Sequence, residues 1–167
     1  MNRVAIFIGS ESDYDVIQEA CRVLEGFGVA YSLDVTSAHR SPERTLSLVR
    51  KAEEEGVSVF IAAAGKAAHL AGVVAAHTLR PVIGVPVESA GLGGLDALLS
   101  TVQMPKGVPV ATVALGKTGA ANAAYLAVQV LSLADPSLGK KLAEDKKRMA
   151  AAVEESSRAL REKRKKA

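Results

Sequence analysis

Five short apolar runs, separated by stretches with helical spacing, constrain the fold of this chain more than any other feature. Between the first two runs, apolar residues recur every three or four positions, as at Val16, Ala20, Val23 and Phe27. Such alternation of strand-like and helix-like segments is typical of repeated βα units. The five runs are Val4–Ile8, Tyr31–Val35, Val57–Ala63, Val82–Val87 and Val110–Leu115.

The continuous apolar character of most runs favours a parallel sheet whose two faces are both covered by helices. A (β/α)₈ barrel would need about 250 residues, whereas this chain has 167. We therefore expect a three-layer α/β/α fold with a flavodoxin-like, doubly wound parallel sheet. The run Tyr31–Val35 alternates apolar and polar residues, which predicts an edge strand.

Capping residues predict where the first two helices begin and end. Ser12 or Asp13 can cap the start of the first helix, and Gly28 can end it. The second helix has Ser41 as its expected N-cap, directly before a proline that suits the first helical position. Gly56 is expected to end that helix.

The character of the chain changes after residue 135. We expect one catalytic domain over residues 1–135 and a charged C-terminal helix over residues 136–167 that packs on the domain or on a neighbouring subunit. Its apolar residues form a narrow stripe at Leu138, Leu142, Met149, Val153 and Leu160. The last ten residues carry six Lys or Arg and one Glu. We interpret them as a solvated helix end rather than a surface for nucleic acid.

Composition narrows the functional class. The single cysteine, Cys21, excludes an internal disulfide and provides no metal-ligand spacing, so we expect no metal site and a reducing, cytoplasmic environment. The N-terminal apolar run is shorter than that of a signal peptide. No apolar run reaches the roughly 18 residues that a membrane span needs. We therefore expect neither a membrane nor a nucleic acid as partner.

The first strand is followed by a loop that could bind an anion. Ser10 and Ser12 supply hydroxyl groups, and the start of the next helix supplies free backbone N–H groups, which together suit a phosphate. The same residues are also ordinary turn and capping chemistry. Asp13 would repel a phosphate, so as a binding residue it is expected to accept hydrogen bonds from sugar hydroxyls.

The loops after the second and third strands each carry a histidine. In the second-strand loop, Arg40 can hold a phosphate or carboxylate, and His39 can both donate and accept a proton. In the third-strand loop, Gly65 allows close approach of a ligand and His69 adds a second imidazole. The alternatives are a surface His-Arg pair and a tightly packed, alanine-rich helix. All three loops fall at the same edge of the sheet, where ligands bind in such folds.

Three other features are less diagnostic. His77 lies near the expected end of the helix that follows His69, and we interpret it as structural. The glycine-rich segment 88–100 could form a flexible lid or pack closely around a subunit axis. The Gly and Ala residues of 119–124 predict a helix that lies close to another backbone.

Six segments form an ordered set: GSESD at Gly9–Asp13, SAHR at Ser37–Arg40, AAHLAG at Ala67–Gly72, PVIGVPV at Pro81–Val87, VQMPKGVPV at Val102–Val110 and GAANAA at Gly119–Ala124. In order and spacing they closely resemble the PurE family, the 5-(carboxyamino)imidazole ribonucleotide mutases. The likeness covers about residues 3–135. It implies an isomerase of purine biosynthesis that moves a carboxyl group from an exocyclic nitrogen to carbon 4 of an imidazole, without cofactor or metal. It also implies a homo-oligomer, an octamer in this family, and a ribonucleotide as substrate.

The resemblance also implies roles for individual residues. His39 matches the proton-transferring histidine and His69 the second active-site histidine. Substrate-binding positions of the family match Ser10, Asp13 and Arg40, and Ser12 and Ser37 line the same pocket. The loop expected to enclose the carboxyl group and carbon dioxide contains Gly65, Lys66, Ala67 and Leu70.

The chain departs from the family pattern at two positions. Lys66 stands where the family usually has a second glycine, and Ala71 where it usually has proline. The Lys66 side chain either points outward or adds a cation to the pocket. The related carboxylase branch, which uses free carbon dioxide, has a basic residue in this loop but no counterpart of His69. The mutase branch, class I, is therefore favoured, with the carboxylase and a non-catalytic nucleotide-binding module as alternatives.

Overall fold

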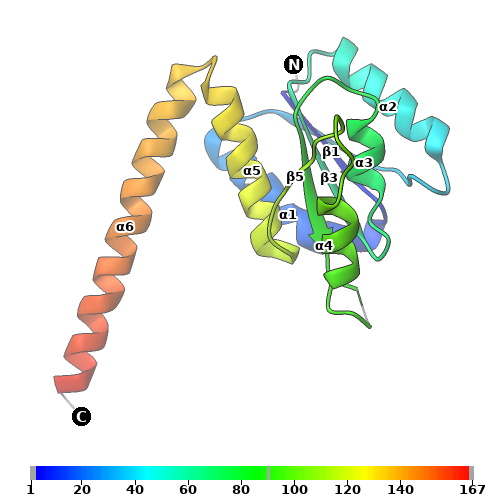
Figure 1. Cartoon of the computed structure of the whole chain (residues 1–167). Coiled ribbons are helices and arrows are strands. Elements are labelled where there is room, and N and C mark those ends of the chain that lie inside the picture. The colour runs from blue at the N-terminus through cyan, green and yellow to red at the C-terminus, as the bar shows by residue number, and fades with distance from the viewer. Residues whose placement is uncertain (1–2, 90, 166–167) are drawn as a thin grey trace.

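The computed structural model describes residues 3–89 and 91–165. Within them, one parallel sheet has the strand order β2-β1-β3-β4-β5 (Figure 1). The strands are β1 (Val4–Ile8), β2 (Tyr31–Val35), β3 (Val59–Gly65), β4 (Val82–Val87) and β5 (Ala111–Thr112). The helices are α1 (Tyr14–Phe27), α2 (Pro42–Glu54), α3 (Leu70–Ala75), α4 (Leu95–Val102), α5 (Gly116–Ser132) and α6 (Pro136–Lys165).

Helices cover both faces of the sheet, which confirms the predicted three-layer, doubly wound fold. Strand residues alternate between two cores, because successive side chains point to opposite faces. Ile6 belongs to the core under α1 and α5, whereas its neighbour Phe7 belongs to the core under α2 and α3. On the face of α3, α4 lies so close to β4 that a Cβ on Gly84 would overlap with Thr101.

The predicted strands β1, β2 and β4 have the observed bounds, but the other two predictions need correction. β3 begins at Val59 rather than Val57, because the Val57 N–H donates to the Ala52 carbonyl at the end of α2. The fifth run, predicted over 110–115, forms only the two-residue strand β5. Its flanking valines, Val110 and Val113, instead pack against opposite cores.

Glycines end the first two helices as predicted. Gly28 has a φ of 71° at the C-cap of α1, and Gly56 has a φ of 84° just after the C-cap of α2. Both values lie in the left-handed region, which glycine adopts without a steric penalty. These sharp helix ends return the chain to the sheet and so align the starts of β2 and β3.

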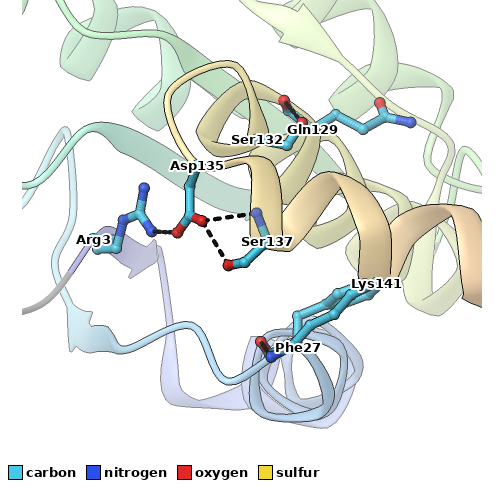
Figure 2. Close-up of polar contacts among 7 residues, drawn as sticks. All are labelled: Arg3, Phe27, Gln129, Ser132, Asp135, Ser137 and Lys141. Carbon is cyan, nitrogen blue, oxygen red and sulfur yellow. Dashed lines mark hydrogen bonds and ion pairs between the residues drawn. The ribbon is translucent and has the colours of Figure 1, made fainter.

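Polar contacts hold the first turns of α6 against the domain (Figure 2). Asp135 forms an ion pair of 2.8 Å with Arg3, and its other oxygen accepts hydrogen bonds from the backbone and hydroxyl of Ser137. These Ser137 hydrogen bonds and the Arg3 charge lower the pKa of the Asp135 carboxyl. The Lys141 ammonium donates to the Phe27 carbonyl at the end of α1, at 2.8 Å.

Beyond its first three turns, α6 projects away from the sheet (Figure 1). Leu138 at its start is buried. Met149, Val153 and Leu160 are exposed, so the distal stripe has no partner within the described part of the chain. The charged end, through Lys165, is also exposed. None of the helices in the described ranges is long and apolar enough to cross a membrane.

A short 3₁₀ turn joins β1 to α1, and two side chains hold it. The Asp13 carboxylate accepts a hydrogen bond from the Ser10 backbone N–H at 3.1 Å, and the Ser10 hydroxyl accepts one from the Ser12 N–H. Asp13 occupies the N-cap position of α1, as predicted, but its side chain bonds back to Ser10 rather than into the helix. Its burial raises the pKa of the carboxyl, an effect that the Ser10 hydrogen bond only partly opposes.

We expect Asp13→Asn to raise the melting temperature at neutral pH. The amide oxygen can still accept the Ser10 N–H, while the unfavourable burial of a charge is removed. Because the folded-state pKa is raised, wild-type stability falls as the pH rises from the ordinary value of 3.8 through the folded-state value. The gain should therefore vanish below that range. Thermal unfolding between pH 3 and pH 7 measures it.

The matched control is Asp15→Asn, which removes an exposed carboxylate from the first turn of the same helix. It should give no gain, because that charge is solvated and interacts favourably with the helix N-terminus. An Asp13→Asn variant that is less stable than the wild type at pH 7 would contradict the desolvation argument.

Candidate active site

A cavity of about 690 Å³ lies at the carboxyl ends of β1, β2, β3 and β4. All of the residues predicted from the sequence as site residues line it: Ser10, Ser12, Asp13, Ser37, His39, Arg40, Gly65, Lys66, Ala67, His69 and Leu70. They come from three loops that are separated in the sequence and converge because parallel strands end at one edge of the sheet.

The loop after β1 forms the floor of one side of the cavity. The Gly9 N–H donates to the Ala63 carbonyl of β3 at 3.0 Å, which fixes the point where the chain leaves the sheet. The hydroxyl of Ser12 donates to that of Ser10 at 2.9 Å. Two hydroxyl groups and the backbone of this turn therefore lie together at the cavity wall.

The loop after β2 is anchored at both of its ends. Buried hydroxyls of Thr36 and Thr45 lie 2.8 Å apart, which ties the start of the loop to α2. Ser41 occupies the predicted N-cap position of α2 but makes no capping hydrogen bond there. Its hydroxyl instead accepts from the Ser37 N–H at 3.0 Å. These contacts close the loop into a compact turn that presents His39 to the cavity.

Arg40 connects the loops after β1 and β2. Its Nη2 donates to the Gly9 carbonyl at 3.2 Å, and its Nε lies 3.4 Å from the Ser37 hydroxyl. The side chain is exposed, and it forms no ion pair with a carboxylate among the residues that the structure describes. Its guanidinium charge is therefore held over the end of β1, where an anionic ligand can reach it.

The two predicted histidines form a direct hydrogen bond. His39 Nε2 lies 2.7 Å from His69 Nδ1, and the rings meet edge to face with centroids 4.9 Å apart. One nitrogen must donate and the other accept, so the pair shares one bridging proton. His69 Nε2 and His39 Nδ1 remain as outer ends. The arrangement can take a proton at one ring and release one at the other.

The loop after β3 approaches the end of β4 closely. A Cβ on Gly65 would lie 3.1 Å from the Val87 carbonyl oxygen, so a larger residue would be tight there. Residues 66–69 are not helical, and α3 begins only at Leu70. The alternative of an alanine-rich packed helix is therefore wrong for this segment. Ala67 and Lys66 are exposed to the cavity side, and Leu70 is buried beneath it.

Sequence reasoning missed the loop after β4. Val87, Glu88 and Ser89 also line the cavity. The glycine-rich segment that begins at Glu88 predicts a lid or a packing segment, whereas its position after a fourth parallel strand indicates the same edge of the sheet. The Ser89 hydroxyl is buried and has no hydrogen-bond partner within the described residues.

Several other predicted features lie outside the cavity. His77 hydrogen-bonds through Nδ1 to the Val73 carbonyl at 2.8 Å, consistent with its structural interpretation. A Cβ on Gly119 would overlap with the backbone of Ala114, which lies just before the start of α5. Over residues 3–89 and 91–165, no group of three or more His, Cys, Asp and Glu side chains could hold a metal ion.

Comparison with known proteins identifies the family. The model of the AIR carboxylase family matches residues 3–152. An N5-carboxyaminoimidazole ribonucleotide mutase of Pyrococcus horikoshii is 52% identical over 95% of this chain and 89% of its own length. The mutase of Escherichia coli K12 is 53% identical over 84% of this chain and 83% of its own length.

The fold agrees with the sequence relationship. A crystal structure of Treponema denticola PurE is 28% identical, with a TM-score of 0.83, and the match covers 94% of this chain and 97% of that one. The family match spans the sheet, the three loops and the histidine pair, so the chain belongs to the AIR carboxylase family, which includes the PurE proteins.

Proposed function

We propose that this protein is an N5-carboxyaminoimidazole ribonucleotide mutase, an isomerase of purine biosynthesis. Relatives with that name share about half of their residues with this chain over most of its length, for example 50% with the Bacillus subtilis protein. The structural observation that carries the proposal is the hydrogen bond between His39 and His69 inside the cavity. It supplies the proton relay that the reaction requires.

The ribonucleotide substrate would span the cavity. Arg40 and the hydroxyls of Ser10, Ser12 and Ser37 form the side that suits the phosphate, because hydroxyls and a guanidinium are good phosphate donors. Asp13, at the same wall, would accept hydrogen bonds from ribose hydroxyls. The imidazole ring would then lie towards the histidines and the loop that contains Gly65, Ala67 and Leu70.

Over the whole reaction, one proton is lost from carbon 4 and one is gained by the exocyclic nitrogen. The bond between the exocyclic nitrogen and the carboxyl carbon breaks, its electron pair stays on nitrogen, and the nitrogen takes a proton. Carbon 4 of the ring then attacks the released carbon dioxide, and the proton on carbon 4 leaves. A residue must therefore donate one proton and accept another at nearby positions, which is the role we assign to His39, with His69 as its partner.

Enclosure matters because the carbon dioxide must not escape between the two steps. The backbone at Gly65 lies against β4, and Leu70 is buried below the loop, so closely packed chain forms the wall of this part of the cavity. A dry pocket also limits loss of the proton to solvent. The loop after β3 therefore combines the two requirements, enclosure by small residues and access to a histidine.

We expect His39→Gln to lower kcat by about 10²–10⁴-fold, the usual contribution of general acid–base catalysis. The terminal amide of glutamine reaches about as far as the Nε2 of histidine, so the contact with His69 can persist while proton transfer cannot. Binding of the ribonucleotide should be retained. Steady-state kinetics and calorimetric titration with the product measure the two quantities.

The matched control is His77→Gln, which removes a histidine outside the cavity. It should leave kcat unchanged. Unchanged turnover in His39→Gln would refute the proton-transfer role. A wild-type protein that binds the ribonucleotide but never turns it over would instead support a non-catalytic binding module.

The protein is also proposed to form a homo-octamer in the cytoplasm. The distal stripe of α6, with Met149, Val153 and Leu160, is exposed, as are Leu95 and Leu99 on α4. Apolar helix faces of this kind support burial against further copies of the chain. The single buried cysteine suits a reducing compartment.

We expect light scattering coupled to size-exclusion chromatography to give the mass of eight chains. Val153→Glu places a charge in the stripe and should reduce that mass. Ala151→Glu adds the same charge on the opposite side of α6 and should not. A single-chain mass for the wild type would contradict the oligomer proposal without affecting the assignment of the histidines.

A further inference from the structure

Lys66 has an unusual backbone conformation at the cavity wall. Its φ is 56°, and among the described residues it is the only residue other than glycine with a positive φ. This left-handed region is unfavourable for a lysine, because its Cβ crowds the neighbouring carbonyl oxygen. Glycine would adopt it freely. A strained residue that lines a ligand cavity points to a use for its side chain.

Lys66 is also a cation at the cavity wall, and no group of the substrate has yet been assigned to it. Among the described residues that line the cavity, Lys66 is the only lysine and Arg40 the only arginine. Arg40 is held over the end of β1 by its hydrogen bond to the Gly9 carbonyl. Lys66 follows β3, on the side of the cavity that borders β4. Within the described residues its ammonium makes no ion pair.

Glu88 is the acidic residue nearest in register. Gly65 pairs with Val87 across β3 and β4, so Lys66 and Glu88 leave neighbouring strands at equivalent positions. They are nevertheless not within ion-pair distance, and both are exposed. The Lys66 charge is therefore available to a ligand.

The proposed substrate has two anionic groups, a phosphate at one end and a carboxyl group at the other. The phosphate fits the side of Arg40. We propose that Lys66 binds the migrating carboxyl group and so makes the site selective for carboxylated ribonucleotides. This inference rests on the proposed mutase function, and it assigns to Lys66 a role that the small residues of its loop cannot perform.

Such a contact affects binding more than the chemical step. The carboxyl group is an anion in the substrate and in the product but neutral as carbon dioxide between them. A cation near it stabilises both bound ends of the reaction and not the released gas. The Lys66 charge should therefore raise the affinity for the substrate and lower KM. It should not raise kcat.

The test compares two ligands that differ by one carboxyl group. Aminoimidazole ribonucleotide and its 4-carboxy derivative are titrated calorimetrically into the wild type and into Lys66→Gly. We expect the variant to bind the 4-carboxy ligand about 10-fold more weakly, through loss of a charge-assisted contact. Affinity for aminoimidazole ribonucleotide should be unchanged. The melting temperature should rise, because glycine relieves the left-handed strain.

Three further variants isolate the charge of Lys66. Lys66→Arg keeps the cation and should retain the selectivity. Lys51→Ala removes an exposed lysine on α2, outside the cavity, and should change neither affinity. Glu88→Gln should leave the selectivity intact, because Glu88 and Lys66 are not paired.

The outcomes separate this inference from the proposed function. Equal weakening of both ligands in Lys66→Gly, or no weakening, would overturn the carboxyl-binding role while wild-type turnover still supports the mutase. Loss of selectivity in Glu88→Gln would also overturn it, since Lys66 would then act through Glu88. A wild type that binds neither ligand would refute the proposed function itself.

Discussion

The hydrogen bond between His39 and His69 depends on the order of the strands. The two residues follow β2 and β3, which are not neighbours, because β1 lies between them in the sheet. The contact therefore passes over the end of β1, where the chain turns into α1. The chain adds β2 on one side of β1 and β3 on the other, so the loops after both strands can reach across this position. The cavity and its proposed proton relay follow from that topology.

Polar contacts hold the first two loops that carry the site. Ser37 and Ser41 close the second loop, and Arg40 ties it to the first through Gly9. The unfavourable features of the fold lie in the same region. Asp13 is a buried carboxylate and Lys66 is a left-handed lysine, both at the cavity wall. Residues that lower the stability of the fold are expected at positions that serve ligand binding.

Much of this arrangement follows from sequence patterns, because hydrophobic periodicity and capping residues act locally. The bounds of β1, β2 and β4 and the glycine at the end of α1 were predictable in this way, as was the convergence of three loops. The shortening of β5 was not, because it depends on how Val110 and Val113 pack against different cores. The left-handed backbone of Lys66 was not predictable either, because a lysine gives no local signal for a positive φ.

The most direct test of the account is which substrate the enzyme prefers. Conversion of N5-carboxyaminoimidazole ribonucleotide is compared with carboxylation of aminoimidazole ribonucleotide by bicarbonate, at matched enzyme concentration. A relay that serves an enclosed carboxyl transfer predicts fast conversion of the first substrate, with little exchange of its labelled carboxyl carbon with dissolved bicarbonate. Faster formation of the product from aminoimidazole ribonucleotide and bicarbonate would contradict the assignment as a mutase.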